Sequence, residues 1–169
     1  MRHRPLVASV AFACVCFAAS AGELDNWTVF TDPTVTFQLS VPQTPKTVDD
    51  VTSESIPYRA FVIDRGGYAM MEMVADYAGR NVDPARVLDQ AAEGAQKRNR
   101  TLVSNVSVTI DGHPGRDIVV GDAAGKLFHD RVFFFDNHLY QTITVLQHDA
   151  TDEQKKAADR FTLSLHFLR

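Results

Sequence analysis

The stretch Leu127–Gln147, LFHDRVFFFDNHLYQTITVLQ, decides the fold of this chain. Two runs rich in β-branched and aromatic residues, Leu127–Phe135 and Leu139–Gln147, flank a short polar segment. Asn137 tolerates the positive φ that tight hairpin turns require. The stretch therefore predicts an antiparallel β-hairpin joined near Asp136-Asn137-His138, and we derive its register with Asn137 and His138 as the turn.

Both faces of this hairpin carry apolar residues. One face holds Phe133, Phe135, Tyr140 and Leu146, and the other holds Phe128, Val132, Phe134, Leu139, Ile143 and Val145. A sheet with one face in water alternates more cleanly between apolar and polar residues. We therefore expect helices or loops over both faces, or a partner over part of one face.

The remaining segments alternate between short strands and two helices. Strands are predicted at 27–31, 37–41, 58–64, 68–77, 101–110, 116–120 and, last, near 163–167, with a polar loop at 46–56. Hairpins dominate and no β-α-β series appears. This order predicts an α+β fold, a central antiparallel sheet with helices packed on it.

The starts of the two helices have clear capping signals. Asp83 can accept hydrogen bonds from the first turn, and Pro84 suits the first helical position. Thr151 and Gln154 have the spacing of a capping box, which predicts a second helix to about Phe161.

The first residues have the layout of a secretory signal. A basic head at residues 2–4 precedes the apolar stretch Leu6–Ala19, and small residues follow at 19–21. The apolar stretch is shorter than the roughly 20 residues that a membrane-spanning helix needs. We expect cleavage after Ala21, which leaves 22–169 as one domain in the periplasm or outside the cell.

Both cysteines, Cys14 and Cys16, lie inside this signal. Cleavage after Ala21 would leave a chain without a thiol, and therefore without disulfides, a cysteine nucleophile or thiolate metal ligands. The alternative is a lipid anchor on Cys14, although the bulky Phe12 and the apolar residues after Cys14 fit such a site poorly.

The charge balance argues against two classes of partner. The chain has 17 basic and 21 acidic residues, for a net charge of −4, and the signal contributes only basic residues. An acidic domain without a basic stripe is not typical of nucleic-acid binding or of adsorption to anionic lipid. After the signal, no apolar run is long enough to span a membrane.

Two histidines of the hairpin could hold a metal ion. In the predicted register His129 faces Leu146, and His148 is its diagonal neighbour on the same face. Zn²⁺ or Cu²⁺ would need a third ligand, for which Asp130 and Asp149 are candidates. The alternative is a pair of ordinary histidines at the open end of a hairpin.

No catalytic or cofactor motif stands out. The sequence has no Gly-x-Ser-x-Gly elbow and no His-Glu-x-x-His run. It therefore predicts a non-enzymatic domain without a cofactor, which binds a protein or a small molecule at a sheet face or loop rim. The candidate surface aromatics, each of which could instead be core, are Tyr58, Tyr68, Tyr77 and Tyr140.

The order of motifs resembles a family of small exported bacterial proteins. The matching segments are Trp27, Thr36–Pro42 with Pro45, Leu88-Asp89, Asp111–Asp117, Arg131–Phe133 with Leu139-Tyr140, and Asp159–Phe161 with Ser164-Leu165. The chain resembles the PsbP-like, Mog-type α/β/α family. The resemblance implies a central antiparallel sheet with helices on both faces, and a role in binding or assembly. It implies no catalytic or ligand residue.

Overall fold

A computed structural model describes residues 26–32, 36–52, 55–97 and 99–168. The expectations for the signal 1–21, for Cys14 and for the cut after Ala21 lie outside these ranges. Among the described residues, no helix is long and apolar enough to cross a membrane.

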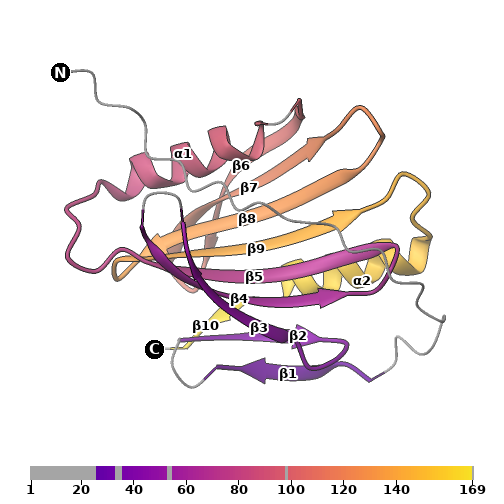
Figure 1. Ribbon diagram of the computed structural model, residues 1–169, viewed down its shortest axis with the longest axis horizontal. Helices are drawn as coiled ribbons and strands as arrows, with labels where there is room; N and C mark the ends of the chain where they lie inside the picture. Colours follow the sequence, from indigo (N-terminus) through magenta and orange to yellow (C-terminus); the bar gives the residue numbers. More distant parts are fainter. Residues whose placement is uncertain (1–25, 33–35, 53–54, 98, 169) are drawn as a thin grey trace.

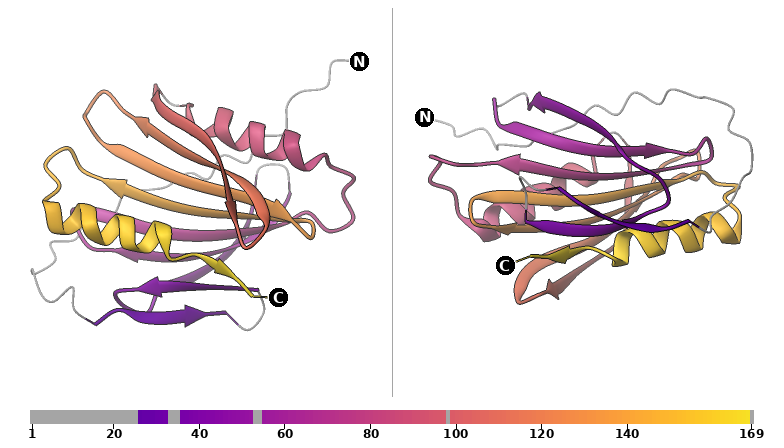
Figure 2. Two further views of the ribbon diagram at one scale, coloured as in Figure 1. Left: turned by 180° about the vertical axis from the view of Figure 1, so that it is seen from behind. Right: turned by 90° about the horizontal axis from the view of Figure 1, so that it is seen from below.

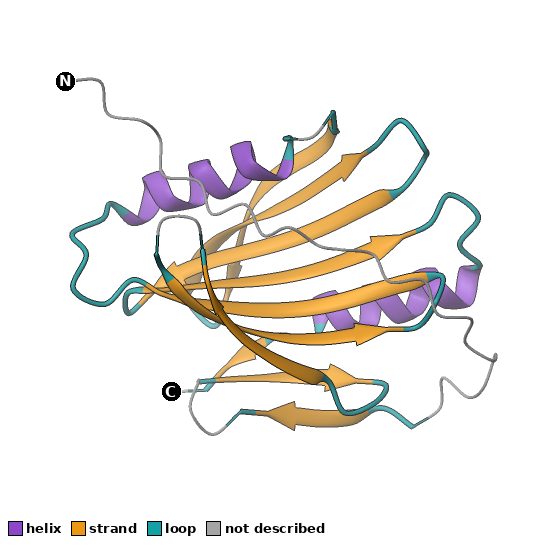
Figure 3. Cartoon of the chain, viewed as in Figure 1, coloured by secondary structure: helices purple, strands orange, loops and turns teal. Residues whose placement is uncertain are grey.

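Seven strands form one antiparallel sheet in the order β3-β4-β5-β9-β8-β7-β6 (Figures 1 and 3). The strands are β3 (Lys46–Val51), β4 (Pro57–Asp64), β5 (Tyr68–Asp76), β6 (Thr101–Ile110), β7 (His113–Gly121), β8 (Leu127–Phe135) and β9 (His138–Leu146). The hairpin β8–β9 lies within this sheet, and the pairing of β5 with β9 joins the two halves of the chain.

A second sheet of three short strands has the order β1-β2-β10, with β1 at Thr28–Thr31, β2 at Phe37–Val41 and β10 at His166–Phe167. Helix α1 (Pro84–Ala95) lies on one face of the large sheet. Helix α2 (Asp152–Leu163) and the small sheet lie on the other (Figure 2). We call these the α1 face and the α2 face. This architecture confirms the predicted α+β class.

Each face of the large sheet has its own core. On the α1 face the helix contributes Val87, Leu88, Ala92 and Ala95, which pack with Ile118, Val132, Phe134 and Leu139. On the α2 face Phe161 and Leu165 pack with Phe37, Phe133 and Tyr140. Burial of apolar surface on both faces stabilises the sheet by about 25 cal/mol per Å². The expectation that both faces are covered is thus confirmed.

Both capping predictions are confirmed. Asp83 Oδ1 accepts a hydrogen bond from the Ala85 N–H at 3.1 Å. In the capping box, the Thr151 N–H donates to Gln154 Oε1 at 2.8 Å, and the Gln154 N–H donates to Thr151 Oγ1 at 3.2 Å. These bonds satisfy amides that the first turn of each helix leaves free.

The hairpin turn was misplaced by one residue. Phe135 pairs with His138, so the turn residues are Asp136 and Asn137. Both have positive φ, 48° and 58°, as a two-residue turn of this twist requires. The register is therefore displaced by two residues along β9. Because side chains alternate with a period of two, the predicted faces are unchanged.

The predicted loop at 46–56 is also wrong, because Lys46–Val51 forms β3 and pairs with β4. All six residues of β3 are exposed, so the strand has no apolar alternation that the sequence could reveal. The final strand is shorter than predicted. It pairs with β2 in the small sheet.

Candidate binding pocket

A small cavity of about 70 Å³ lies on the α1 face beyond the end of α1. Strand β5 lines it with residues 69–71, β9 with Ile143 and Val145, β8 with Phe128, and the segment after α1 with Arg100. The lining thus contains one charged side chain, that of Arg100, and its other side chains are apolar.

The sheet register brings this lining together. Phe128 is opposite Val145, and Val145 is opposite Ala69, which forms one row across three strands. The next row contains Ile143 and Met71. Alternation places these side chains on the same face as α1, but α1 ends at Ala95 and its packing is centred on β7 and β8. The floor over β5 and β9 therefore lies beyond that helix.

Arg100 reaches the pocket from the short connection between α1 and β6. Asn99 has a positive φ of 61°, which turns the chain out of the helix just before Arg100. The guanidinium carbon lies 3.6 Å from the centroid of the Phe128 ring. A cation over an aromatic face is stabilised by about 0.5 to 2 kcal/mol, so the ring holds the charge at the pocket.

A buried carboxyl group lies next to the lining. Asp130 is opposite Ile143 in the sheet, and its Oδ2 accepts a hydrogen bond from Gln141 Nε2 at 2.6 Å. Burial raises the pKa of Asp130 to about 7, against the lowering effects of the Gln141 hydrogen bond and of the positive charges of His129 and Arg100. Near neutral pH the charge beside the pocket therefore depends on pH.

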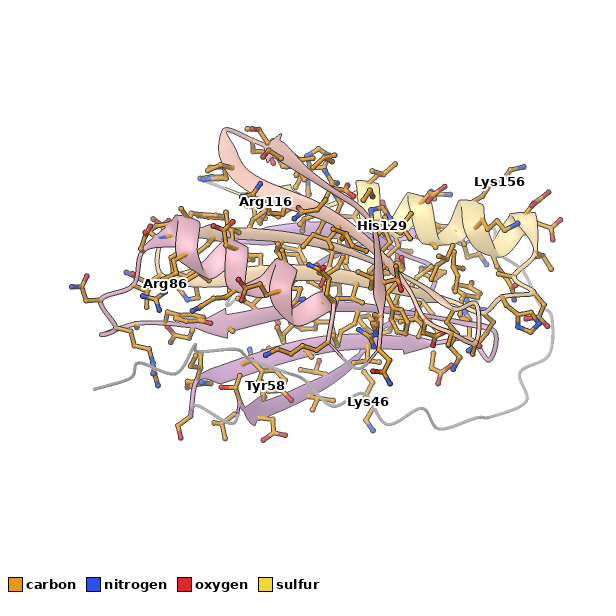
Figure 4. All side chains as sticks on the ribbon, turned by 90° about the horizontal axis from the view of Figure 1, so that it is seen from above. Lys46, Tyr58, Arg86, Arg116, His129 and Lys156 are labelled. Atoms are coloured by element: carbon orange, nitrogen blue, oxygen red, sulfur yellow. The ribbon has the colours of Figure 1, made fainter. Side chains whose placement is uncertain are left out.

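His129 lies on the opposite face, near the end of α2 (Figure 4). Its Nε2 is 2.8 Å from Asp117 Oδ1, and Arg131 Nε is 3.1 Å from Asp117 Oδ2. Arg131 Nη1 also donates to the Thr162 carbonyl at 3.2 Å. These contacts tie β7 and β8 to the last turn of α2.

The charges around Asp117 make this cluster a stable ion-pair network. Burial alone would raise the pKa of Asp117, but the hydrogen bond and charge of His129 and the charge of Arg131 lower it overall. The Asp117 carboxylate is thus already in contact with two partners, the His129 ring and the Arg131 guanidinium. We interpret His129 as a structural residue of the α2 face.

His148 does not lie where the metal hypothesis needs it. His129 is opposite Thr144 instead of Leu146, and His148 follows the end of β9. The His148 ring is largely exposed, with Nδ1 3.8 Å from Asp149 Oδ1. In the described part of the chain, no group of three or more His, Cys, Asp or Glu residues could hold a metal ion.

Three of the four tyrosines are core residues, so the expectation of exposure fails for them. Tyr68 is buried on the α2 face, and Tyr77 packs edge-on against Phe134 on the α1 face. Tyr140 is buried, and its hydroxyl is 3.3 Å from Thr36 Oγ1. Only Tyr58 is partly exposed, on the side of the sheet away from α2 (Figure 4).

The sequence reasoning missed the pocket because its residues come from four separate segments. In the sequence, Arg100 is one of several basic residues just after the predicted first helix, and such a position is typical of cations that oppose the helix dipole. The shared parity of Phe128, Ile143 and Val145 was visible in the hairpin. What brings Ala69 and Met71 beside them is the pairing of β5 with β9, which has no local signal.

The two sheets and two helices define an α+β protein of PsbP-like fold. The solution structure of cyanobacterial PsbP (CyanoP) from Synechocystis sp. PCC 6803 matches with a TM-score of 0.54 and 13% sequence identity, over 89% of this chain and 98% of that one.

A second solved structure, of the protein of unknown function PA94 from Pseudomonas aeruginosa, has a TM-score of 0.46 and 12% identity, over 78% of this chain and 90% of that one. No protein-family model and no curated protein matches the sequence. At these identities, the similarity to CyanoP concerns the fold alone.

Proposed function

We propose that this protein is an exported, non-enzymatic binding domain whose pocket receives a small carboxylate with an apolar body. The observation that carries the proposal is the Arg100 guanidinium held 3.6 Å above the Phe128 ring at an apolar cavity. A ligand pocket typically combines apolar walls with a few polar groups that fix orientation. Here Arg100 is that group.

The chemistry of the lining favours binding over catalysis. Its side chains are alanine, methionine, phenylalanine, isoleucine and valine, with one arginine. The apolar side chains can contact the alkyl chain of a ligand and exclude water from it, and the arginine can pair with the carboxylate group of the same ligand. The cavity of about 70 Å³ limits the enclosed part of the ligand to a short apolar segment.

Straight-chain carboxylates test this function directly. We expect hexanoate or octanoate to bind the purified protein in a calorimetric titration, and hexanol, which has no charge, to bind more weakly. Arg100→Met keeps the apolar stem and removes the charge, so it should weaken carboxylate binding by about tenfold or more.

Arg86→Met is the matched control, because Arg86 is an exposed arginine on α1 (Figure 4). It should leave carboxylate binding unchanged. If the wild-type protein binds no carboxylate, or if Arg100→Met binds as well as the wild type, the proposal fails.

Export is supported by the signal layout of residues 1–21. We expect the protein isolated from the periplasmic or secreted fraction to begin at Gly22, as N-terminal sequencing can determine. A mature protein that retains Met1 to Ala21, or that carries a lipid on Cys14, would contradict cleavage at this position.

A further inference from the structure

Strand β6 forms one edge of the large sheet, so one side of its backbone has no partner strand among the described residues. Its ten residues, TLVSNVSVTI, include no charged residue and no proline. The opposite edge, β3, carries Lys46, Asp49 and Asp50. Because charges and prolines are the usual protection of edge strands, β3 is protected against pairing and β6 is not.

Exposed apolar side chains accompany the unprotected edge. Val103 is 64% exposed, Val106 is 53% exposed and Leu102 is 40% exposed. Leu127 of β8 is also exposed, and a Cβ at Gly121 would lie 3.7 Å from Leu127 and 4.0 Å from Val103. The apolar surface thus continues from β6 across β7 to β8. Such a surface favours contact with another protein.

A shift in register between Leu102 and Ser104 separates the start of β6 from a regular segment, Ser104–Ile110. Within that segment Ser104, Val106, Val108 and Ile110 lie on the α2 face, and Asn105, Ser107 and Thr109 lie on the α1 face. One face of the edge is mainly apolar and the other is polar and neutral. Read in the reverse direction, the segment has nearly the same pattern.

We infer that β6 pairs antiparallel with β6 of a second copy of this chain, about a two-fold axis near Ser107. This register places Val106 opposite Val108, and Asn105 opposite Thr109. On one face the two apolar pairs of Val106 with Val108 therefore meet at the centre, with Ser104 opposite Ile110 at the ends; polar residues meet on the other face, and no like charges oppose each other. A two-fold interface requires such self-complementarity.

Pairing would extend the two seven-stranded sheets into one continuous sheet. It would satisfy backbone groups of both edges at once, as in other strand additions. The apolar surface formed by Val103 and Leu127 would lie beside the junction and contribute further buried area. The inference does not rest on the pocket, because neither β6 nor Leu127 lines it.

Opposite charges at position 106 test the pairing. In the proposed register the two Val106 side chains are diagonal neighbours on one face, within reach of long charged side chains. We expect the wild type to sediment as a dimer, Val106→Lys and Val106→Glu to weaken dimerisation about tenfold or more, and an equal mixture of the two variants to restore the dimer.

Val51→Lys is the matched control, because Val51 is 57% exposed on the other edge strand. It should leave the dimer intact. Circular dichroism of each variant checks that the fold is retained, which the exposure of Val106 favours. A monomeric wild type, a dimer that survives both charges, a mixture that remains monomeric, or a dimer lost in Val51→Lys would overturn the inference.

The same variants separate this inference from the proposed ligand. Val106→Lys should bind octanoate as the wild type does, whatever its state of association. If neither the wild type nor any variant binds a carboxylate, but the wild type is a dimer, only the pocket proposal is rejected. A monomer that binds octanoate would reject only the pairing.

Discussion

Glu72 is the most deeply buried carboxyl group on the α2 face, with no exposed surface. Thr142 Oγ1 donates a hydrogen bond to Glu72 Oε2 at 2.5 Å, while Oε1 has no hydrogen-bond partner among the described residues. Burial raises the pKa of Glu72 to about 8. The Thr142 hydrogen bond opposes this shift and the charge of Asp130 adds to it. The folded protein therefore holds this group protonated and neutral near pH 7.

The raised pKa predicts that stability falls as the pH rises. Between the ordinary value of 4.5 and about 8, the folded state binds a proton at Glu72 that the unfolded state has released. This contribution is fully present below pH 4.5 and is lost as the pH rises through about 8. Urea unfolding at several pH values should show a loss on the order of 3 to 5 kcal/mol from this group.

Glu72→Gln should remove the part of this pH dependence that comes from Glu72, since glutamine resembles the protonated acid, and should leave the part that comes from buried Asp130. The variant should be more stable than the wild type above pH 8. Glu93→Gln, on the exposed part of α1, is the control and should follow the wild-type profile. Parallel profiles for Glu72→Gln and the wild type would show that Glu72 is not the titrating group.

The sequence makes Glu72 conspicuous but does not explain it. The residue stands between Met70 and Val74 in an apolar strand, and alternation places all three on one face. Its partner Thr142 is 70 residues away, and only the pairing of β5 with β9 brings them together. The apolar pattern of β5 therefore predicts that Glu72 is buried, but it does not predict the hydrogen bond with Thr142.

At the scale of the element, β7 shows why a strand can require glycine. A Cβ at Gly115 would lie 2.4 Å from Phe133 Cδ1 and 2.4 Å from the Val132 carbonyl oxygen. Phe133 is completely buried, and the second contact is with backbone, so neither can move freely. Gly115→Ala should destabilise the protein by about 1 to 3 kcal/mol or more, as measured by thermal or urea unfolding.

Gly121→Ala supplies the matched control in the same strand. Its added Cβ would meet Leu127 at 3.7 Å, an ordinary van der Waals distance. The change should be close to neutral or slightly stabilising, because alanine restricts the unfolded chain. Equal stability of the two variants would mean that the strand can shift to relieve the contact at Gly115.

The elements that the sequence predicted best are those with local signals. The capping box at Thr151 and the cap at Asp83 need only their own first turns, and both form as expected. Strand β3 depends on β4 and carries no apolar stripe of its own, so its six exposed residues resembled a loop. Strand β3 forms by pairing with β4, and the sequence of β3 alone does not show that pairing.

At the scale of the whole molecule, the apolar residues on both faces of the hairpin predicted that both faces of the sheet would be covered. The faces of Phe133 and Phe134 are those expected, and each is covered by one helix and its neighbours. The strand order and the separate small sheet were not predicted. They depend on pairings between segments far apart in the chain, such as Phe37 with Phe167.

Phe167 joins the small sheet to the large one and tests whether they unfold together. It pairs with Phe37 of β2, its N–H donates to Asp111 Oδ2 at 2.8 Å, and its ring lies 4.6 Å from Phe135 and 5.0 Å from Tyr140 between centroids. Phe167→Ala should cost about 3 to 5 kcal/mol in urea unfolding.

The variant should also raise hydrogen exchange in β2 more than in β8, since β2 pairs directly with the strand β10 that contains Phe167, whereas β8 lies inside the seven-stranded sheet. Leu168→Ala removes the adjacent side chain, which is 38% exposed, and should change both measurements little. A small loss of stability in Phe167→Ala with unchanged exchange in β2 would mean that the small sheet is held by α2 and β1 without this ring. A large loss with equal exchange in β2 and β8 would mean that both sheets open as one cooperative unit.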